Sequence, residues 1–344
     1  MLHIGLDVHA RQWTYVVLDE NGKKRMTRSG GGAWTKLLQE LAEIKEEFAI
    51  CFEASTGYGY FYDALRKIAK RVSVAHPGHL RLIFRSKKKN DRVDAQKLAK
   101  LLFLDEVPPV YVPSIDVRSW RRMIEYRHSL VGERTRLKNR LRALLRTRGI
   151  VPPKGLWFKK GIAWLKDVDF DTDFDNLQRD LLVDELEAFT QRIVRVESAV
   201  NVTAEAHPGV QLLMTIPGVG VRTGEAVMAY VDDPQRFSGA SKLSSYFGLV
   251  PSQDQSASTN RLGRITREGP RTVRKLLVEA AWQGIRRSER IRTYYERMQH
   301  GNPDRKKIAI VATAHYLVRV MHAMLRTGEV WRTQIIDSKQ PTAA

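Results

Sequence analysis

Four acidic residues in the N-terminal part of the chain have types and spacing suited to metal-dependent chemistry. Asp7 interrupts the apolar run HIGLDV, and Glu53 ends the apolar run FAICFE. Asp91 and Asp94 follow three lysines in KKKNDRVDAQKLA, and their spacing of three places both carboxylates on one helix face. Convergent carboxylates repel one another and raise one another's pKa unless a cation is present. We therefore predict a site for Mg²⁺ or Mn²⁺, hard cations that prefer oxygen ligands.

Each acid also has a structural explanation. Asp91 could cap the helix that it opens, and Asp94 could be favoured in the first turn by the helix dipole. Glu53, at a strand end facing a Ser-Thr-Gly turn, fits either reading. Asp7 is harder to explain, because burying it unpaired in an apolar strand would cost on the order of several kcal/mol. Asp7 therefore favours a metal site, and two such ions could cleave a phosphodiester.

The composition limits the class of partner. The 344 residues carry a formal charge of +20, which favours a polyanion such as nucleic acid. One cysteine excludes an internal disulfide, and the nine histidines show no paired metal spacing. No uninterrupted apolar run of roughly 18 residues suggests a membrane span. We therefore expect a cytoplasmic protein with no membrane partner.

The N-terminal residues predict a mixed α/β domain over 1–108. Residues 2–29 read as a three-stranded antiparallel meander, with Asn21-Gly22 as a hairpin turn. Helical periodicity then alternates with short apolar strands. Helices are predicted over 33–47, 58–70 and from Asp91 to about Leu104, and strands over 48–53 and 72–75. Prolines 108, 109 and 113 mark the end of the domain.

A basic coiled-coil region is predicted over 109–205. Helices over 114–148 and 176–204 each carry an apolar seam, and the second seam has heptad spacing. Eleven Lys/Arg lie between 118 and 148 against Glu125 and Glu133, which favours a nucleic-acid stripe over a merely solvated face. The candidate contacts are Arg121, Arg122, Arg134, Lys138 and Arg142. The acidic link DVDFDTDFD lacks a calcium loop's glycine and is interpreted as a solvated loop that ends in helix-favouring acids.

A mainly helical domain is predicted over 206–337, followed by a disordered tail over 338–344. TIPGVGVRTGEAVMAYV places Pro-Gly-Val-Gly between two apolar helical stretches, as in a helix-hairpin-helix. Gly218 and Gly220 could bring backbone N–H groups close to a phosphate. A plain helix–turn–helix connection would look similar.

Several motifs together resemble one known family. GLDVHA, FEASTGYGY and KNDRVDAQKLA, with Asp7, Glu53, Asp91 and Asp94, resemble the DEDD motifs of a RuvC-like, RNase H-like domain. The form is similar to the DEDD transposases of a large group of bacterial insertion sequences, related to pilin-gene invertases. IPGVG, YFGLVP and RLGRITREG resemble that family's second conserved domain, so the likeness covers most of the chain in order.

The resemblance implies a composite site in which a serine attacks DNA and forms a phosphoserine link. In GLVPSQDQSASTNRLGRITREG, alignment on GLVP and on RLG places Ser256 at the nucleophile position. Ala257 and Ser258 stand where glycines are common in the family, which leaves Ser258 as a second candidate. Arg261, Arg264 and Arg267, with Lys87, Lys88 and Lys89, are candidate phosphate contacts.

The resemblance also implies the partners. Members act on donor and target DNA, guided by a structured non-coding "bridge" RNA, as homodimers or homotetramers. An arginine-rich helix fits recognition of RNA by shape and phosphate. Two alternatives remain: a metal-dependent endonuclease or junction resolvase that uses water as nucleophile, and a non-enzymatic nucleic-acid scaffold. The scaffold is disfavoured because four acids would only weaken simple DNA binding.

Overall fold

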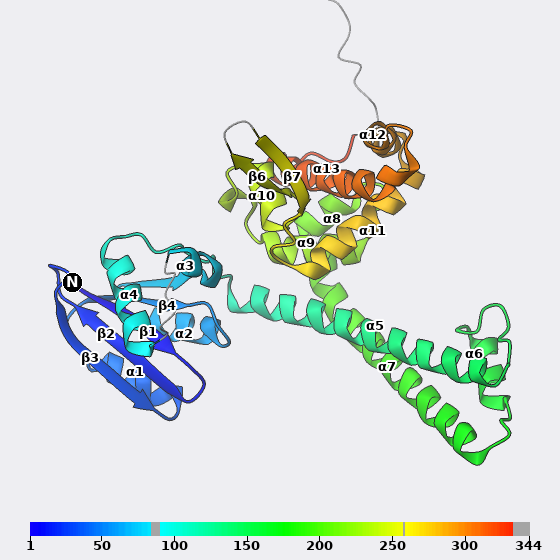
Figure 1. Cartoon of the computed structure of the whole chain (residues 1–344), viewed down its shortest axis with the longest axis horizontal. Coiled ribbons are helices and arrows are strands. Elements are labelled where there is room, and N and C mark those ends of the chain that lie inside the picture. The colour runs from blue at the N-terminus through cyan, green and yellow to red at the C-terminus, as the bar shows by residue number, and fades with distance from the viewer. Residues whose placement is uncertain (84–89, 257–258, 333–344) are drawn as a thin grey trace, which may run out of the picture. The chain divides into compact units, whose positions relative to one another are not determined.

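A computed structural model describes residues 1–83, 90–256 and 259–332 of the chain (Figure 1). The chain divides into two compact units, Met1–Ile115 and the residues from Asp116 onward. The proposed further division of the second unit at residues 205/206 stays a prediction, and the tail over 338–344 lies outside the described residues.

The first unit is built on a five-stranded mixed sheet in the order β3-β2-β1-β4-β5. The strands are β1 (Leu2–Val8), β2 (Gln12–Leu18), β3 (Lys24–Gly31), β4 (Phe48–Glu53) and β5 (Arg71–Ala75). The first three form an antiparallel meander, and β4 and β5 run parallel to β1 and β4 respectively. The predicted mixed α/β fold is confirmed.

Helices cover both faces of this sheet (Figure 1). On one face, α1 (Trp34–Ala42) and α2 (Tyr58–Leu65) bury leucines and Phe61 against Ile4 and Leu6 of β1. On the other face, α4 (Asp91–Phe103) buries Ala95 and Ala99 against β2 and Leu98 beside β4. The short helix α3 (Pro77–Ile83) adds Leu80 to this second layer. The period-two alternation of β2, β4 and β5 thus supplies side chains to two separate cores.

Gly5 fixes the distance between β1 and α4. A Cβ atom at Gly5 would lie 2.0 Å from the carbonyl oxygen of Ala95 and 2.2 Å from the amide nitrogen of Ala99. The strand and the helix therefore approach backbone to backbone, which only a residue without a side chain allows. Since Asp7 lies two residues after Gly5, it shares the sheet face that α4 covers.

Two long antiparallel helices begin the second unit, α5 (Ile115–Thr147) and α7 (Asp173–Ala206). Trp120 and Ile124 at the start of α5 share a core with Val200 near the end of α7. The end of α5 and the start of α7 share another core, which α6 (Lys159–Asp167) completes. The predicted hairpin of long helices is confirmed, but α7 begins earlier than predicted, so Asp173 and Asp175 lie in its first turn and not in the loop before it.

Arg127 is buried where the helical hairpin meets the C-terminal helices. Its Nη1 lies 3.2 Å from Glu197 Oε1 on α7, and its Nη2 lies 3.8 Å from Glu225 Oε1 on α9 (Val221–Val231). Arg222 also pairs with Glu225, at 3.2 Å. Burial raises the pKa of Glu225 even though both arginines lower it. This charge cluster joins α5, α7 and α9 at a fixed register.

The remaining helices pack into one large core with the start of α5 and the end of α7. They are α8 (Pro208–Met214), α9, α10 (Ala240–Tyr246), α11 (Arg271–Arg287), α12 (Glu289–Gln299) and α13 (Lys306–Thr327). Among the described residues, one helical stretch, Pro303–Thr327, is long and apolar enough to cross a membrane by length and composition. Half of its apolar window is buried in the unit, as is typical of a core helix.

Candidate functional site: an acidic cluster in the first unit and a serine hairpin in the second

Asp7 lies near the carboxyl end of β1 on the face covered by α4. Its side chain is 16% exposed and is therefore largely removed from water. The strand around it is apolar. Glu53 ends β4, which pairs parallel to β1 with Leu6 opposite Phe52. Glu53 therefore follows Phe52 at the same sheet edge as Asp7, and its side chain is exposed there.

The N-terminus of α4 brings the second pair of acids to this edge. Asn90, not Asp91, caps the helix, because the Asn90 side chain accepts a hydrogen bond from the Arg92 amide at 3.0 Å. Asp91 is therefore free of the capping role that the sequence allowed it. Asp94 pairs with Lys97 at 3.1 Å. The close packing at Gly5 sets the height of both acids above β1.

His9 and Gln12 belong to this cluster, and the sequence did not single them out. Nε2 of His9 lies 3.5 Å from Asp7 Oδ1 and 4.0 Å from Asp91 Oδ1. Gln12 Nε2 donates a hydrogen bond to Asp91 Oδ2 at 3.1 Å. Trp34 Nε1 donates to the carbonyl of His9 at 3.0 Å and so holds the turn between β1 and β2. Ligand atoms of Asp7, His9 and Asp91 all lie within 4.8 Å of one another.

The surroundings of Asp7 disfavour its charged form. Burial raises the pKa of Asp7, His9 opposes this, and Asp91, Asp94 and Glu53 each raise the pKa further. A buried carboxylate surrounded by other carboxylates is unfavourable without a cation. The arrangement therefore fits a divalent cation.

The donor set fits the predicted class of metal. Carboxylate oxygens from β1, β4 and α4 are the ligands that Mg²⁺ and Mn²⁺ prefer, and an imidazole nitrogen suits Mn²⁺ better than Mg²⁺. Asp7 and Asp91 with His9 would form the centre of the site. When bound, the cation would supply Lewis-acid stabilisation of negative charge on a phosphate.

Ser256 ends β6 (Pro251–Ser256) in the second unit, and it is exposed. This strand pairs antiparallel with β7 (Thr259–Ile265), and Ser256 stands opposite Thr259. The sequence analysis did not anticipate this two-stranded hairpin. Ser258, the second candidate nucleophile, lies outside the described residues. The acids belong to the first unit and the serine to the second.

The base of this hairpin is held by backbone contacts around two glycines. A Cβ at Gly248 would lie 2.3 Å from the Glu268 carbonyl oxygen, and one at Gly269 would lie 2.0 Å from that of Tyr246. Arg274 of α11 donates to the carbonyls of Phe247 at 3.2 Å and Gly269 at 3.1 Å, and also to that of Glu268. The YFGLVP and ITREGP segments, which lead into β6 and out of β7, are thus held together at the base of the serine hairpin.

The predicted nucleic-acid contacts fall into different surroundings. Arg261, Arg264 and Arg267 are exposed on or directly after β7, Arg122 and Arg142 are exposed on α5, and Arg134 and Lys138 are half-buried there. Arg121 instead donates to the carbonyls of Ala229 at 2.6 Å and Tyr230 at 3.2 Å, so its guanidinium serves the fold. Lys87, Lys88 and Lys89 lie outside the described residues. The roles of these residues in binding stay predictions.

The two glycines of the PGVG turn also differ. A Cβ at Gly218 would lie 2.4 Å from the amide nitrogen of Gly284, so Gly218 lets the turn pack on α11. Gly220 has nothing within 4 Å of such a Cβ, and it precedes α9 as its N-cap. Of the pair, Gly220 keeps the open approach that a phosphate contact needs, and that role stays a prediction.

Comparison with known proteins covers both units. A family model described as a transposase matches residues 4–149, a range that contains all four acids. A model described as the transposase IS116/IS110/IS902 family matches residues 210–296, which contain Ser256.

Curated relatives of this chain carry related names. The transposase for insertion sequence element IS1111A of Coxiella burnetii is 27% identical over 281 residues, 81% of this chain and 76% of the relative. The transposase for insertion sequence element IS1328 of Yersinia enterocolitica is 22% identical over 284 residues, 82% of this chain and 85% of the relative. A pilin gene-inverting protein of Moraxella lacunata is 27% identical over 151 residues, 43% of this chain and 47% of the relative.

Proposed function

We propose that the acidic cluster and Ser256 are the two parts of the catalytic machinery of this chain. The chain belongs to the IS110 family of insertion-sequence transposases and so is a DNA transposase or recombinase. The observation that supports the first part is that Glu53 of β4 and Asp91 and Asp94 of α4 all disfavour the charged form of Asp7 on β1. These residues would hold Mg²⁺ or Mn²⁺.

Ser256 is the proposed nucleophile. Its Oγ would form a bond to the phosphorus of a DNA phosphodiester as one phosphorus–oxygen bond to the sugar breaks. The proton leaves Oγ, and the released sugar oxygen gains one. Because one phosphate ester replaces another, the step can run in reverse to rejoin strands without an external energy source. Its place at the end of β6, exposed and on a clamped hairpin, supports this role.

The cations near the hairpin would stabilise the phosphate during this step. Arg261 and Arg264 are exposed on β7, and Arg267 follows it with a left-handed backbone, φ 59°. A guanidinium group can donate two parallel hydrogen bonds to two oxygens of one phosphate, which suits these arginines to hold a DNA strand at the serine.

We further propose that a structured bridge RNA selects donor and target DNA. The chain would work as a homodimer or homotetramer in the cytoplasm, at the nucleoid.

The covalent adduct distinguishes this mechanism from its alternative. Wild-type protein incubated with labelled donor DNA and Mg²⁺ should leave a protein–DNA species that survives a denaturing gel. Ser256→Ala should abolish it, with Ser252→Ala on the same strand as the matched control. An adduct that persists in Ser256→Ala and disappears in Ser258→Ala would move the nucleophile. Cleavage with free ends and no adduct would instead support a water-using endonuclease.

A further inference from the structure

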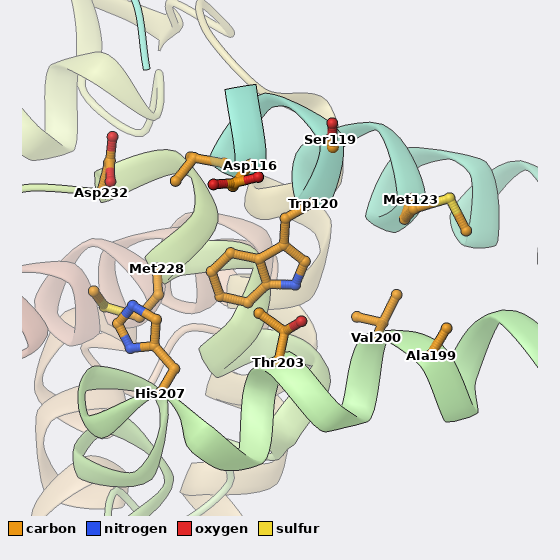
Figure 2. Close-up of a pocket in the computed structure, with 11 residues that line it drawn as sticks. Asp116, Ser119, Trp120, Met123, Ala199, Val200, Thr203, His207, Met228 and Asp232 are labelled. Atoms are coloured by element: carbon orange, nitrogen blue, oxygen red, sulfur yellow. The ribbon is translucent and has the colours of Figure 1, made fainter. Parts of the chain in front are cut away.

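Two cavities in the second unit differ in their charge. One of 410 Å³ lies at the start of α5 and the end of α7 and is lined by Trp120, His207, Asp116 and Asp232, among others (Figure 2). Its two carboxylates disfavour a phosphate. The other, of 660 Å³, lies at the far end of the same helical hairpin, beside α6. Its size falls within the usual range for ligand pockets, about 300–1,000 Å³.

The second cavity, hereafter the α6 cavity, gathers cations without matching acids. Arg134 and Lys138 of α5 and Lys159 and Lys166 of α6 line it. Among its lining residues Glu187 supplies a carboxylate, and this already pairs with Lys166 at 2.7 Å. Burial lowers the pKa of Lys138, and the neighbouring Arg134 and Arg142 lower it further. An anion bound here would relieve that repulsion.

The α6 cavity also has an aromatic and apolar wall. Trp157 and Ile162 line it together with Ala163 and Leu186. Lys138 Nζ and the Arg142 guanidinium lie 5.1 Å and 5.2 Å from the centroid of the Trp157 ring, so cations and the ring are held together. Thr190 and Gln191 of α7 add hydrogen-bonding groups.

Phosphate-binding cations beside an aromatic ring and a few polar groups are what an unpaired nucleotide requires. A duplex offers its phosphates but keeps its base faces stacked, so it could use the cations and not the apolar wall. We propose that the α6 cavity binds one nucleotide of a single-stranded nucleic acid, with the phosphate on Arg134 and Lys138 and the base against Trp157 and Ile162. This deepens the role proposed above for the basic helical hairpin, and it rests on the family's action on nucleic acid.

Binding measurements on the full chain test this directly. The probes are a labelled single-stranded RNA of about 12 nucleotides, a DNA of the same sequence and length, and the blunt DNA duplex. Lys138→Gln should weaken single-strand binding and lower the salt slope by about 0.7, the change expected for one lost phosphate contact. Trp157→Leu should weaken it about tenfold. Trp157→Leu should weaken duplex binding less, because a duplex cannot use the apolar wall.

Two neighbouring lysines give a matched control. Lys159 lines the cavity and Lys160, exposed on the same helix, does not. Lys159→Gln should therefore weaken single-strand binding more than Lys160→Gln. Trp157 also packs against a hydrophobic core, so the thermal stability of Trp157→Leu should be measured alongside its binding. If that variant is unfolded, the comparison of the two lysine variants tests the proposal.

The outcomes separate this site from the catalytic proposal. A preference for RNA over DNA would identify a guide RNA strand as the occupant, and a preference for DNA would identify a DNA strand. Either result supports the proposal that the α6 cavity binds a single-stranded nucleotide. Equal losses for Lys159→Gln and Lys160→Gln, or equal losses for Trp157→Leu on duplex and single strand, would overturn it. Asp7→Asn, which should abolish DNA cleavage, should keep wild-type binding of the single strands, so the two proposals fail independently.

Discussion

Nε2 of His9 lies 3.5 Å from Oδ1 of Asp7, although the histidine stands in the turn that follows the strand of the acid. The contact places an imidazole inside a cluster of carboxylates that burial and mutual repulsion make unfavourable. Proton binding and metal binding at Asp7 are therefore expected to control both the stability of the first unit and the chemistry of the chain.

The pH dependence of stability should change in Asp7→Asn. Because the folded-state pKa of Asp7 is raised above its ordinary value of 3.8, its contribution favours the folded state at low pH and is lost as the pH rises through the raised pKa. Without metal, Asp7→Asn should thus be more stable than wild type near neutral pH, and the difference should shrink toward about pH 4. Urea unfolding with a chelator measures it, with the exposed Glu43→Gln as control. A difference that grows toward low pH would contradict this assignment.

His9 should affect one metal more than the other. If its imidazole is a ligand, His9→Ala should lower Mn²⁺ affinity by about tenfold and Mg²⁺ affinity less, because nitrogen ligands favour the transition metal. Titration calorimetry with each metal measures the ratio. His79→Ala, an exposed histidine of the same unit, should leave both affinities unchanged. Equal losses for both metals would limit His9 to orienting Asp7.

Gly5 should be intolerant of the smallest side chain. Gly5→Ala places a Cβ 2.0 Å from the Ala95 carbonyl oxygen, so α4 must move away from β1 and take Asp91 and Asp94 with it. We expect a loss of roughly 1–3 kcal/mol in unfolding free energy, together with a loss of DNA cleavage. Gly132→Ala, in the exposed middle of α5 with nothing within 4 Å of the new Cβ, should instead stabilise by about 0.5–1 kcal/mol. A neutral Gly5→Ala would show that α4 is not held in this way.

Arg274 should affect activity through the base of the serine hairpin. It donates to backbone carbonyls at the base of the serine hairpin, so Arg274→Met should loosen that base and slow adduct formation, at a cost to stability of about 1–3 kcal/mol. Arg286→Met, on an exposed site of the same helix, should change neither. Hydrogen exchange of the hairpin amides is the accompanying measurement. Unchanged exchange with lost activity would point to direct contact with DNA instead.

The strands and the acids were within reach of the sequence because they carry periodic signals. Short apolar or alternating runs predicted β1, β2 and β4, and Asp7, the acid that interrupts the first run, lies in the cluster. His9 carries no such signal, since its contact depends on how the turn after β1 folds back. The hairpin of β6 and β7 was missed because PSQDQS is exposed at every position, and no apolar alternation marks it.

Two candidate nucleic-acid contacts, Gly218 and Arg121, have structural neighbours that residue type does not reveal, and their roles in binding stay predictions. Gly218 reads like a phosphate-approach glycine, yet the backbone it approaches belongs to Gly284 of α11. Arg121 reads like its basic neighbours on α5, yet it binds the end of α9. Both contacts join segments far apart in the chain, which local sequence cannot specify.

The most direct test of the central claim is the location of bound Mn²⁺ in crystals of the wild-type chain, found by anomalous scattering. The metal should lie between Asp7, Asp91 and His9, within reach of Glu53 or Asp94, and it should be lost in Asp7→Asn. Manganese bound elsewhere, in a protein whose DNA cleavage needs the metal and survives Asp7→Asn, would contradict the assignment of the acidic cluster as the catalytic metal centre.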